Sequence, residues 1–189
     1  KVVVTSNQLS KVAIDLPALC PGVQRWLMVD GAVEGYEDYT HAISTFPTEN
    51  LSKEPAGNFM LYSSGTTGRP KGILKPLPTA LVSDENNVIG ALQKQLWGFD
   101  ENTVYLSPSP LYHSAPVGFC TGAQSLGGTV IMLPKFNELQ ALHAIQDYKV
   151  THSQWVPTMF SRMLKVDEAQ RNVFDLSSQE VVIHAAAPC

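Results

Sequence analysis

Residues Leu61–Gly72, with the sequence LYSSGTTGRPKG, are the stretch from which the rest of the chain can be interpreted. The apolar run at 59–62 predicts the end of a buried strand. Six small residues follow at 63–68, and four of them carry hydroxyl groups. The two glycines allow backbone N–H groups to converge on one point, and hydroxyls can donate to an anionic oxygen. With the positive charges of Arg69 and Lys71, the stretch predicts a phosphate-binding site.

The loop differs from the two common phosphate-binding motifs. A Walker motif has four residues between its glycines and ends in Gly-Lys-Ser/Thr. Here two residues separate Gly65 from Gly68, and Lys71 is followed by another glycine. The chain contains no Gly-x-Gly-x-x-Gly, so the Rossmann dinucleotide fingerprint is missing as well. A plain polar loop between two strands is the alternative interpretation.

Residues 63–71 resemble, at every position, the phosphate loop of the superfamily of acyl- and aryl-CoA synthetases, peptide-synthetase adenylation domains and firefly-type luciferases. The resemblance implies that this loop grips the β- and γ-phosphates of ATP while a substrate carboxylate attacks the α-phosphorus, giving acyl-AMP and pyrophosphate. It implies ATP, Mg²⁺ and CoA as cofactors and co-substrates. The implied nucleotide-binding residues are Ser63, Ser64, Gly65, Thr66, Thr67, Gly68 and Lys71. Thr66, Thr67 and Lys71 are the implied catalytic residues, and Thr66 or Thr67 is the hydroxyl expected near Mg²⁺.

A second segment, residues 111–119, follows a predicted strand and a proline turn. His113 should therefore lie at the carboxyl end of that strand, where α/β sheets bind ligands. A histidine with a purely structural role is the alternative. The family has an aromatic residue or histidine here, lining the pocket for the acid. The resemblance thus implies a substrate pocket formed by His113 and by three residues on the turns after it, Ala115, Gly118 and Phe119.

The chain ends in His-Ala-Ala-Ala-Pro-Cys, which resembles the Gly-Gly-Ala-Pro segment that lies against adenine in the family. This implies that Ala185, Ala186, Ala187 and Pro188 also bind the nucleotide. Alanine stands at two positions where the family more often has glycine. A methyl group there narrows the approach of the backbone to the ring. An ordinary strand end is the alternative.

The order of predicted elements indicates an α/β fold with mostly parallel sheets flanked by helices. One helix is predicted over 9–19, and another after residue 83 should bury Val88, Ile89, Leu92 and Leu96 on one face. A surface connection at 46–58 suggests two substructures, residues 1–55 and 56–189. Strands are predicted at 1–5, 26–29, 104–106, 129–133, 150–155 and 180–184.

Composition narrows the class of protein. The chain has 189 residues, and 44% of them are hydrophobic. Its net charge of −4 does not provide the positive potential that attracts nucleic acid. Its three cysteines lie far apart, so neither a disulfide framework nor a zinc site is expected. With no long apolar run and no signal peptide, we expect a cytoplasmic protein without a transmembrane segment, with peripheral membrane association as one route to fatty acids. Homo-oligomers are left open.

The chain begins in one predicted strand and ends shortly after another, so we expect an incomplete, internal portion of the N-terminal domain of an AMP-forming synthetase. The expected activity of the whole enzyme is ATP-dependent conversion of a carboxylic acid, fatty or related, to acyl-AMP and then acyl-CoA. The 189 residues alone should be inactive, because the family's later carboxylate and lysine motifs are missing from them. The alternatives are an aryl-CoA ligase, a peptide-synthetase adenylation domain and a non-catalytic nucleotide-binding module.

Overall fold

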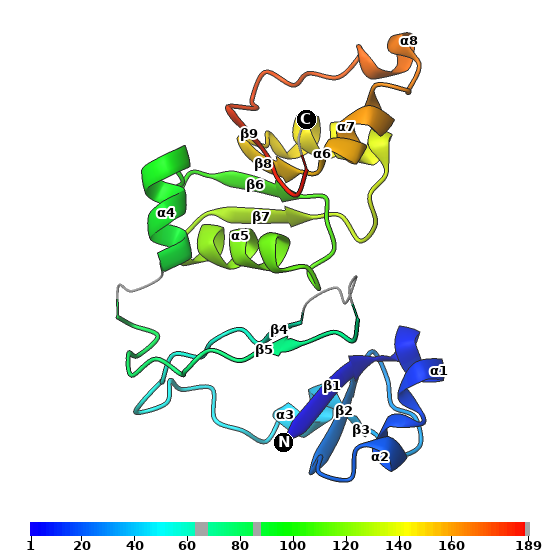
Figure 1. Ribbon diagram of the computed structural model, residues 1–189, viewed down its shortest axis with the longest axis vertical. Coiled ribbons are helices and arrows are strands. Elements are labelled where there is room, and N and C mark those ends of the chain that lie inside the picture. Colours follow the sequence, from blue (N-terminus) through cyan, green and yellow to red (C-terminus); the bar gives the residue numbers. More distant parts are fainter. Residues whose placement is uncertain (63–67, 85–87, 188–189) are drawn as a thin grey trace. The chain divides into compact units, whose positions relative to one another are not determined.

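The computed structural model describes residues 1–62, 68–84 and 88–187. The chain divides into two compact units, Lys1–Ser52 and Lys53–Cys189 (Figure 1). Each unit has its own sheet and its own hydrophobic core. Both larger sheets are parallel, and the predicted α/β class with mostly parallel, helix-flanked sheets is confirmed.

The first unit is a three-stranded parallel sheet with the order β1–β2–β3. Its strands are β1 (Val2–Ser6), β2 (Arg25–Val29) and β3 (Glu37–Asp38). Its helices are the 3₁₀ helix η1 (Asn7–Leu9), α1 (Ser10–Ala13), α2 (Leu16–Leu19) and α3 (Tyr39–Ile43). The core contains Ala13, Met28 and Tyr36, and the Tyr36 hydroxyl donates to the main-chain oxygen of Ala13 at 2.7 Å.

The single helix predicted over 9–19 is wrong, because three short helical segments occupy this stretch. Pro17 is the physical reason. In a continuous helix its ring would collide with the carbonyl of Ala13, four residues earlier. Here Pro17 instead lies in the first turn of α2, where a missing N–H costs nothing.

The second unit begins with a short antiparallel hairpin of β4 (Leu61–Tyr62) and β5 (Gly72–Ile73). The prediction that the run at 59–62 ends a buried strand is wrong in this structure. Phe59 and Met60 are exposed, and Tyr62 exposes 68% of its surface. Only two residues are paired on each side of the hairpin. Because the hairpin is so short, little of the described chain packs over its apolar side chains.

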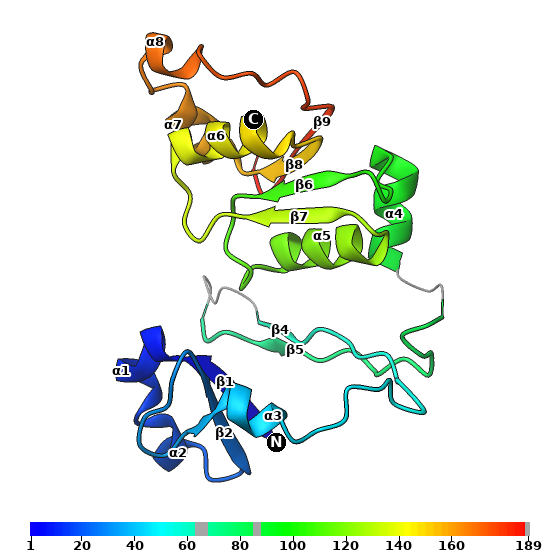
Figure 2. The ribbon, with the colours of Figure 1, turned by 180° about the vertical axis from the view of Figure 1, so that it is seen from behind.

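The main sheet of the second unit is parallel, with the order β7–β6–β8–β9 (Figures 1 and 2). Tyr105 and Leu106, neighbours in β6, point to opposite faces and into different cores. Helices α4 and α5 contribute to the core around Tyr105, while α6 and α7 contribute to the one around Leu106. The strands are β6 (Val104–Ser107), β7 (Thr129–Met132), β8 (His152–Trp155) and β9 (Val181–His184). The helices are α4 (Val88–Trp97), α5 (Ser114–Ser125), α6 (Glu138–Tyr148), α7 (Pro157–Met163) and α8 (Glu168–Arg171).

Helix α4 turns a different side to the core than its apolar pattern predicts. Val88, Leu92 and Leu96 expose 69%, 47% and 60% of their surfaces. The buried residues of α4 are Gly90 and Gln93. The Gln93 amide donates to the main-chain oxygen of Phe119 in α5 at 3.1 Å, so a polar contact joins these helices where apolar packing was predicted.

Candidate active site

The phosphate loop joins β4 to β5, and only its second half is described. Ser63, Ser64, Gly65, Thr66 and Thr67 lie outside the described residues. Gly68 is exposed and has a φ of +153°, a conformation that side-chain-bearing residues rarely adopt. Lys71 is exposed one residue before β5. Position 68 therefore favours glycine because of its backbone conformation.

His113 is the N-cap residue of α5, at the end of the turn that follows β6. Its backbone N–H donates to the Pro110 oxygen at 3.2 Å, and its ring lies 4.4 Å from the ring of Tyr112. Its side chain makes no capping hydrogen bond to the helix. The first N–H groups of a helix have no partners within the helix, and the helix dipole places positive charge there. The N–H groups of Ser114 and Ala115 are therefore donors suited to a carboxylate or phosphate oxygen, whereas Pro116, the third residue of α5, has none.

Ala115, Gly118 and Phe119 lie inside α5, so the prediction that they occupy turns is wrong. The small residues that suggested turns instead permit close helix packing. A Cβ atom on Gly118 would lie 3.3 Å from Ile89 Cδ1, and one on Gly122 would overlap the Gln93 side chain. Composition alone cannot separate these two uses of glycine.

The structure does not bring the predicted pocket residues onto one surface. Gly118 is buried, and Ala115 is exposed. Phe119 packs in an aromatic cluster with its ring 5.9 Å from that of Tyr105 and 5.4 Å from that of Trp97. His113 lies next to the pocket described below, through its neighbour Ser114.

A mainly apolar pocket of about 190 Å³ lies between the β4–β5 hairpin, α4 and α5. Of the predicted substrate residues, Gly118 lines it. The side chains that come from the hairpin and the residues beside it were not predicted from the sequence. Phe59 and Leu61, and likewise Ile73 and Lys75, are two positions apart, and residues two apart in a strand point to the same face. This spacing could have predicted that they line one pocket. The lining residues are Asn58, Phe59, Leu61, Ile73, Lys75, Ile89, Ser114, Val117 and Gly118.

The predicted adenine segment continues from β9. The Ala185 N–H donates to the Trp155 oxygen at 3.1 Å and so extends the pairing with β8. Ala186 has a φ of +77°, a conformation that favours glycine. Ala187 is exposed, and Pro188 lies outside the described residues. Position 186 is one of the two where alanine replaces the family's more common glycine. Its backbone conformation is one that favours glycine.

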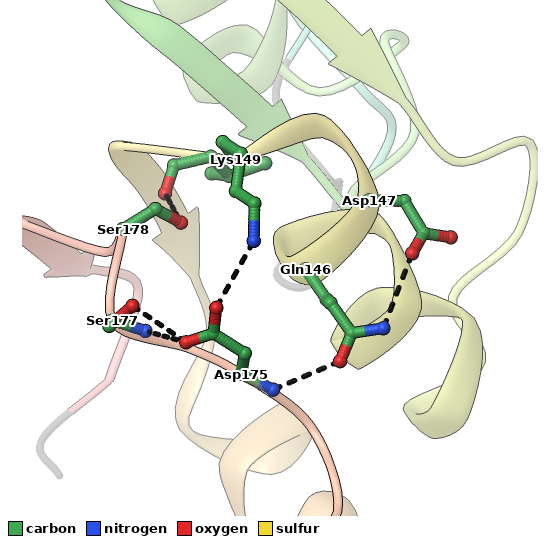
Figure 3. A network of polar contacts seen from close by, with 7 residues as sticks. Gln146, Asp147, Lys149, Asp175, Ser177 and Ser178 are labelled. Carbon is green, nitrogen blue, oxygen red and sulfur yellow. Dashed lines mark hydrogen bonds and ion pairs between the residues drawn. The ribbon is translucent and has the colours of Figure 1, made fainter.

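The loop before β9 is tied to the end of α6 by polar contacts that the sequence did not predict (Figure 3). The Asp175 carboxylate accepts from the Ser177 hydroxyl at 2.6 Å and from Lys149 Nζ at 3.1 Å. The Asp175 N–H donates to Gln146 Oε1 at 3.0 Å, and the Ser178 hydroxyl donates to the Val150 oxygen at 2.9 Å. The hydrogen bonds from Ser177, followed by Lys149, lower the pKa of Asp175 to about 2.

Burial raises the pKa of the Cys120 thiol, which keeps it neutral near pH 7 and argues against a nucleophilic role. Within residues 1–62, 68–84 and 88–187, no three His, Cys, Asp or Glu side chains lie together as metal ligands. Across the same residues, none of the helices has the length and apolar character needed to cross a membrane.

The chain is 30% identical over 178 residues to the probable CoA ligase CCL5 of Humulus lupulus, covering 86% of this chain and 31% of that protein. It is 30% identical over 128 residues to the medium/long-chain fatty acid–CoA ligase FadD8 of Mycobacterium tuberculosis, covering 68% of this chain and 21% of that one. The chain therefore spans less than a third of the length of these curated relatives.

A solved structure shows the same fold. The N-terminal domain of FACL13 from Mycobacterium tuberculosis superposes with a TM-score of 0.78 at 22% identity, covering 100% of this chain and 45% of that one. The family model described as AMP-binding enzyme matches residues 1–189, the whole of the chain. The chain belongs to the AMP-binding enzyme family.

Proposed function

We propose that this chain is part of an ATP-dependent acid–CoA ligase that activates an apolar carboxylic acid, fatty or related, as acyl-AMP and then transfers the acyl group to CoA. The observation that carries the proposal is the match of the entire chain to the AMP-binding enzyme family, combined with the hydroxyl-rich loop that ends in Lys71. The likeness to a medium/long-chain fatty acid–CoA ligase supports the apolar acid. A cytoplasmic location belongs to the same proposal.

In this proposal the loop 63–71 binds the β- and γ-phosphates through its hydroxyls, its backbone N–H groups and Lys71. Fixed donors of this kind stabilise the charge that develops as the carboxylate oxygen attacks the α-phosphorus and pyrophosphate leaves. Mg²⁺, held by the phosphates and the hydroxyl of Thr66 or Thr67, would supply further charge neutralisation. Ala185, Ala186, Ala187 and Pro188 would lie against the adenine.

We place the carboxylate of the acid at the N-terminus of α5. A carboxylate beside His113 would meet the first N–H groups of α5 and the positive end of its dipole. The apolar part of the acid would then follow Ser114 and Gly118 into the pocket beneath the hairpin. Lys75 lines the same pocket and adds a positive charge that favours an acid over a neutral molecule. Ala115 and Phe119 do not line this pocket, so the proposed path of the acid does not include them.

The test is ATP–pyrophosphate exchange by the full-length protein with a panel of fatty and aromatic acids. Substitution Lys71→Ala should reduce exchange by about ten- to a hundredfold, the range expected for one lost charged hydrogen bond to phosphate. Lys165→Ala, at an exposed position in the segment after α7, is the matched control and should retain activity. Undiminished exchange in the Lys71→Ala protein would contradict the assignment. A preference for aromatic acids would favour an aryl-CoA ligase instead.

A further inference from the structure

A chain of buried polar contacts joins β8 to the residue that leads into β9. The indole N–H of Trp155 donates to Ser153 Oγ at 2.7 Å, and this hydroxyl donates to Gln179 Oε1 at 3.0 Å. Trp155 exposes 2% of its surface and Ser153 none. Trp155 and Ser153 are closed to water, so each depends on its partner for its hydrogen bond, whereas Gln179 is half-buried.

The amide nitrogen of Gln179 completes the connection. It donates to the Thr151 oxygen at 2.8 Å and to the Val181 oxygen at 3.1 Å, so both of its N–H groups are used. Thr151 directly precedes β8, and Val181 begins β9. One side chain thus links the residue before β8 to the first residue of β9.

Trp155 contacts both this polar chain and the residue that follows β9. Its side chain leads through Ser153 to Gln179, while its main-chain oxygen accepts from the N–H of Ala185. Between these points β9 pairs in parallel with β8, with His152 opposite Val181 and Trp155 opposite His184. A slip of β9 by one residue would break the Gln179 contacts and turn its side chains to the opposite face.

We infer that Gln179 is a positioning residue that sets the register of β9 and thereby places Ala185–Ala187 relative to β8. The inference deepens the proposed function, because it rests on the assignment of that segment to the adenine of ATP. Gln179 lies six residues before Ala185 and acts through β9, without touching the nucleotide. A leucine at 179 would fill a similar volume, but it would leave the Ser153 hydroxyl without this acceptor. The Thr151 oxygen would keep the backbone N–H groups of Glu180 and Val181, at 2.8 and 3.0 Å, as its donors.

The experiment compares three variants of the full-length protein. Gln179→Leu and Ser153→Ala interrupt the polar chain at different points. Lys149→Met is the matched control, because it removes the exposed ion pair to Asp175 in the same loop and leaves Gln179 intact. The measurements are the KM for ATP, the KM for the acid, ATP affinity by calorimetry, and hydrogen exchange at the Ala185 amide.

In Gln179→Leu and Ser153→Ala, the KM for ATP should rise by about three- to tenfold, the effect of one or two lost buried hydrogen bonds. The KM for the acid should stay within about twofold, and the two changes combined should be less than additive. Exchange at the Ala185 amide should become faster in both variants and stay unchanged in Lys149→Met.

The outcomes separate the inference from the proposed function. Unchanged ATP affinity and unchanged Ala185 exchange in the Gln179→Leu protein would overturn the positioning role, even in an active enzyme. Equal increases in both KM values would overturn it too, because that pattern indicates general loosening. If the unmodified protein shows no pyrophosphate exchange with any acid, the proposed function fails, and hydrogen exchange at Ala185 still decides whether Gln179 sets the register.

Discussion

The Nε2 atom of His152, in β8, lies 2.8 Å from the main-chain oxygen of Trp97, the last residue of α4. A carbonyl oxygen can only accept, so Nε2 carries a proton and donates it, while Nδ1 lies 2.8 Å from the Thr151 hydroxyl oxygen. The ring also lies 4.5 Å from that of Phe99, in the core shared by α4 and α5. This contact fixes the end of the helix whose Ile89 lines the apolar pocket.

Replacing His152 with leucine should lower the free energy of unfolding by about 1–3 kcal/mol, because the main-chain oxygen of the half-buried Trp97 loses its donor. Urea denaturation of the full-length protein measures the change. His41→Ala is the control, since His41 lies on an exposed position of α3 and should have an effect within about 0.5 kcal/mol. A His152→Leu protein as stable as the unmodified one would show that this hydrogen bond does not hold α4 in place.

Filling the apolar pocket should shorten the preferred acid. In the full-length protein, Gly118→Val adds volume to the pocket at a position where a Cβ already meets Ile89. Each methylene excluded from the pocket removes about 0.8 kcal/mol of binding, so the loss of kcat/KM should grow with chain length while the KM for ATP stays nearly constant.

Ala115→Val is the matched variant on the exposed side of the same helix. A chain-length-dependent loss in the Ala115→Val protein, with none in Gly118→Val, would move the acid to the other side of α5. The same fractional loss for every acid in both proteins would argue against an acid site along this helix.

Ala186→Gly should stabilise the protein, because Ala186 has a φ of +77° that glycine adopts without strain. The expected gain is up to about 1 kcal/mol. Ala185→Gly is the neighbouring comparison, at a residue without positive φ, and should cost about 0.5–1 kcal/mol through the greater flexibility of the unfolded chain. Thermal unfolding of the two proteins gives the sign directly. Destabilisation by both substitutions would mean that position 186 carries no strain.

The Asp175 carboxylate should make stability depend on pH in the acid range. Its folded-state pKa of about 2 lies below the ordinary value of 3.8. Its contribution is therefore fully present above the ordinary value and is lost as the pH falls towards the folded-state value. The difference in unfolding free energy between the unmodified protein and Asp175→Asn should shrink over this range.

Because the hydrogen bonds from Ser177 are the largest cause of this pKa shift, Ser177→Ala should remove more of the pH dependence than Lys149→Met. Denaturant titrations at several pH values measure it. A larger effect of Lys149→Met would show that the ion pair, rather than the local hydrogen bonds, holds the carboxylate ionised.

The sequence by itself was sufficient for the family and for the parallel α/β class. These are local properties, because a loop signature is contiguous and the alternation of strands and helices can be read from short windows. It also placed His113 just after a strand, where the structure has it as the N-cap of α5.

Tertiary structure alone decided which side of each helix is buried and which distant residues meet. The apolar stripe of α4 identifies a helix, but its buried side is set by α5, whose Gly122 leaves room for the Gln93 side chain. The hydrogen bond from Ser153 to Gln179 joins residues 26 positions apart. Neither a serine nor a glutamine predicts, by its residue type, a partner so far along the chain. Periodicity describes a helix or strand relative to its own axis, whereas register and burial depend on where the neighbouring elements lie.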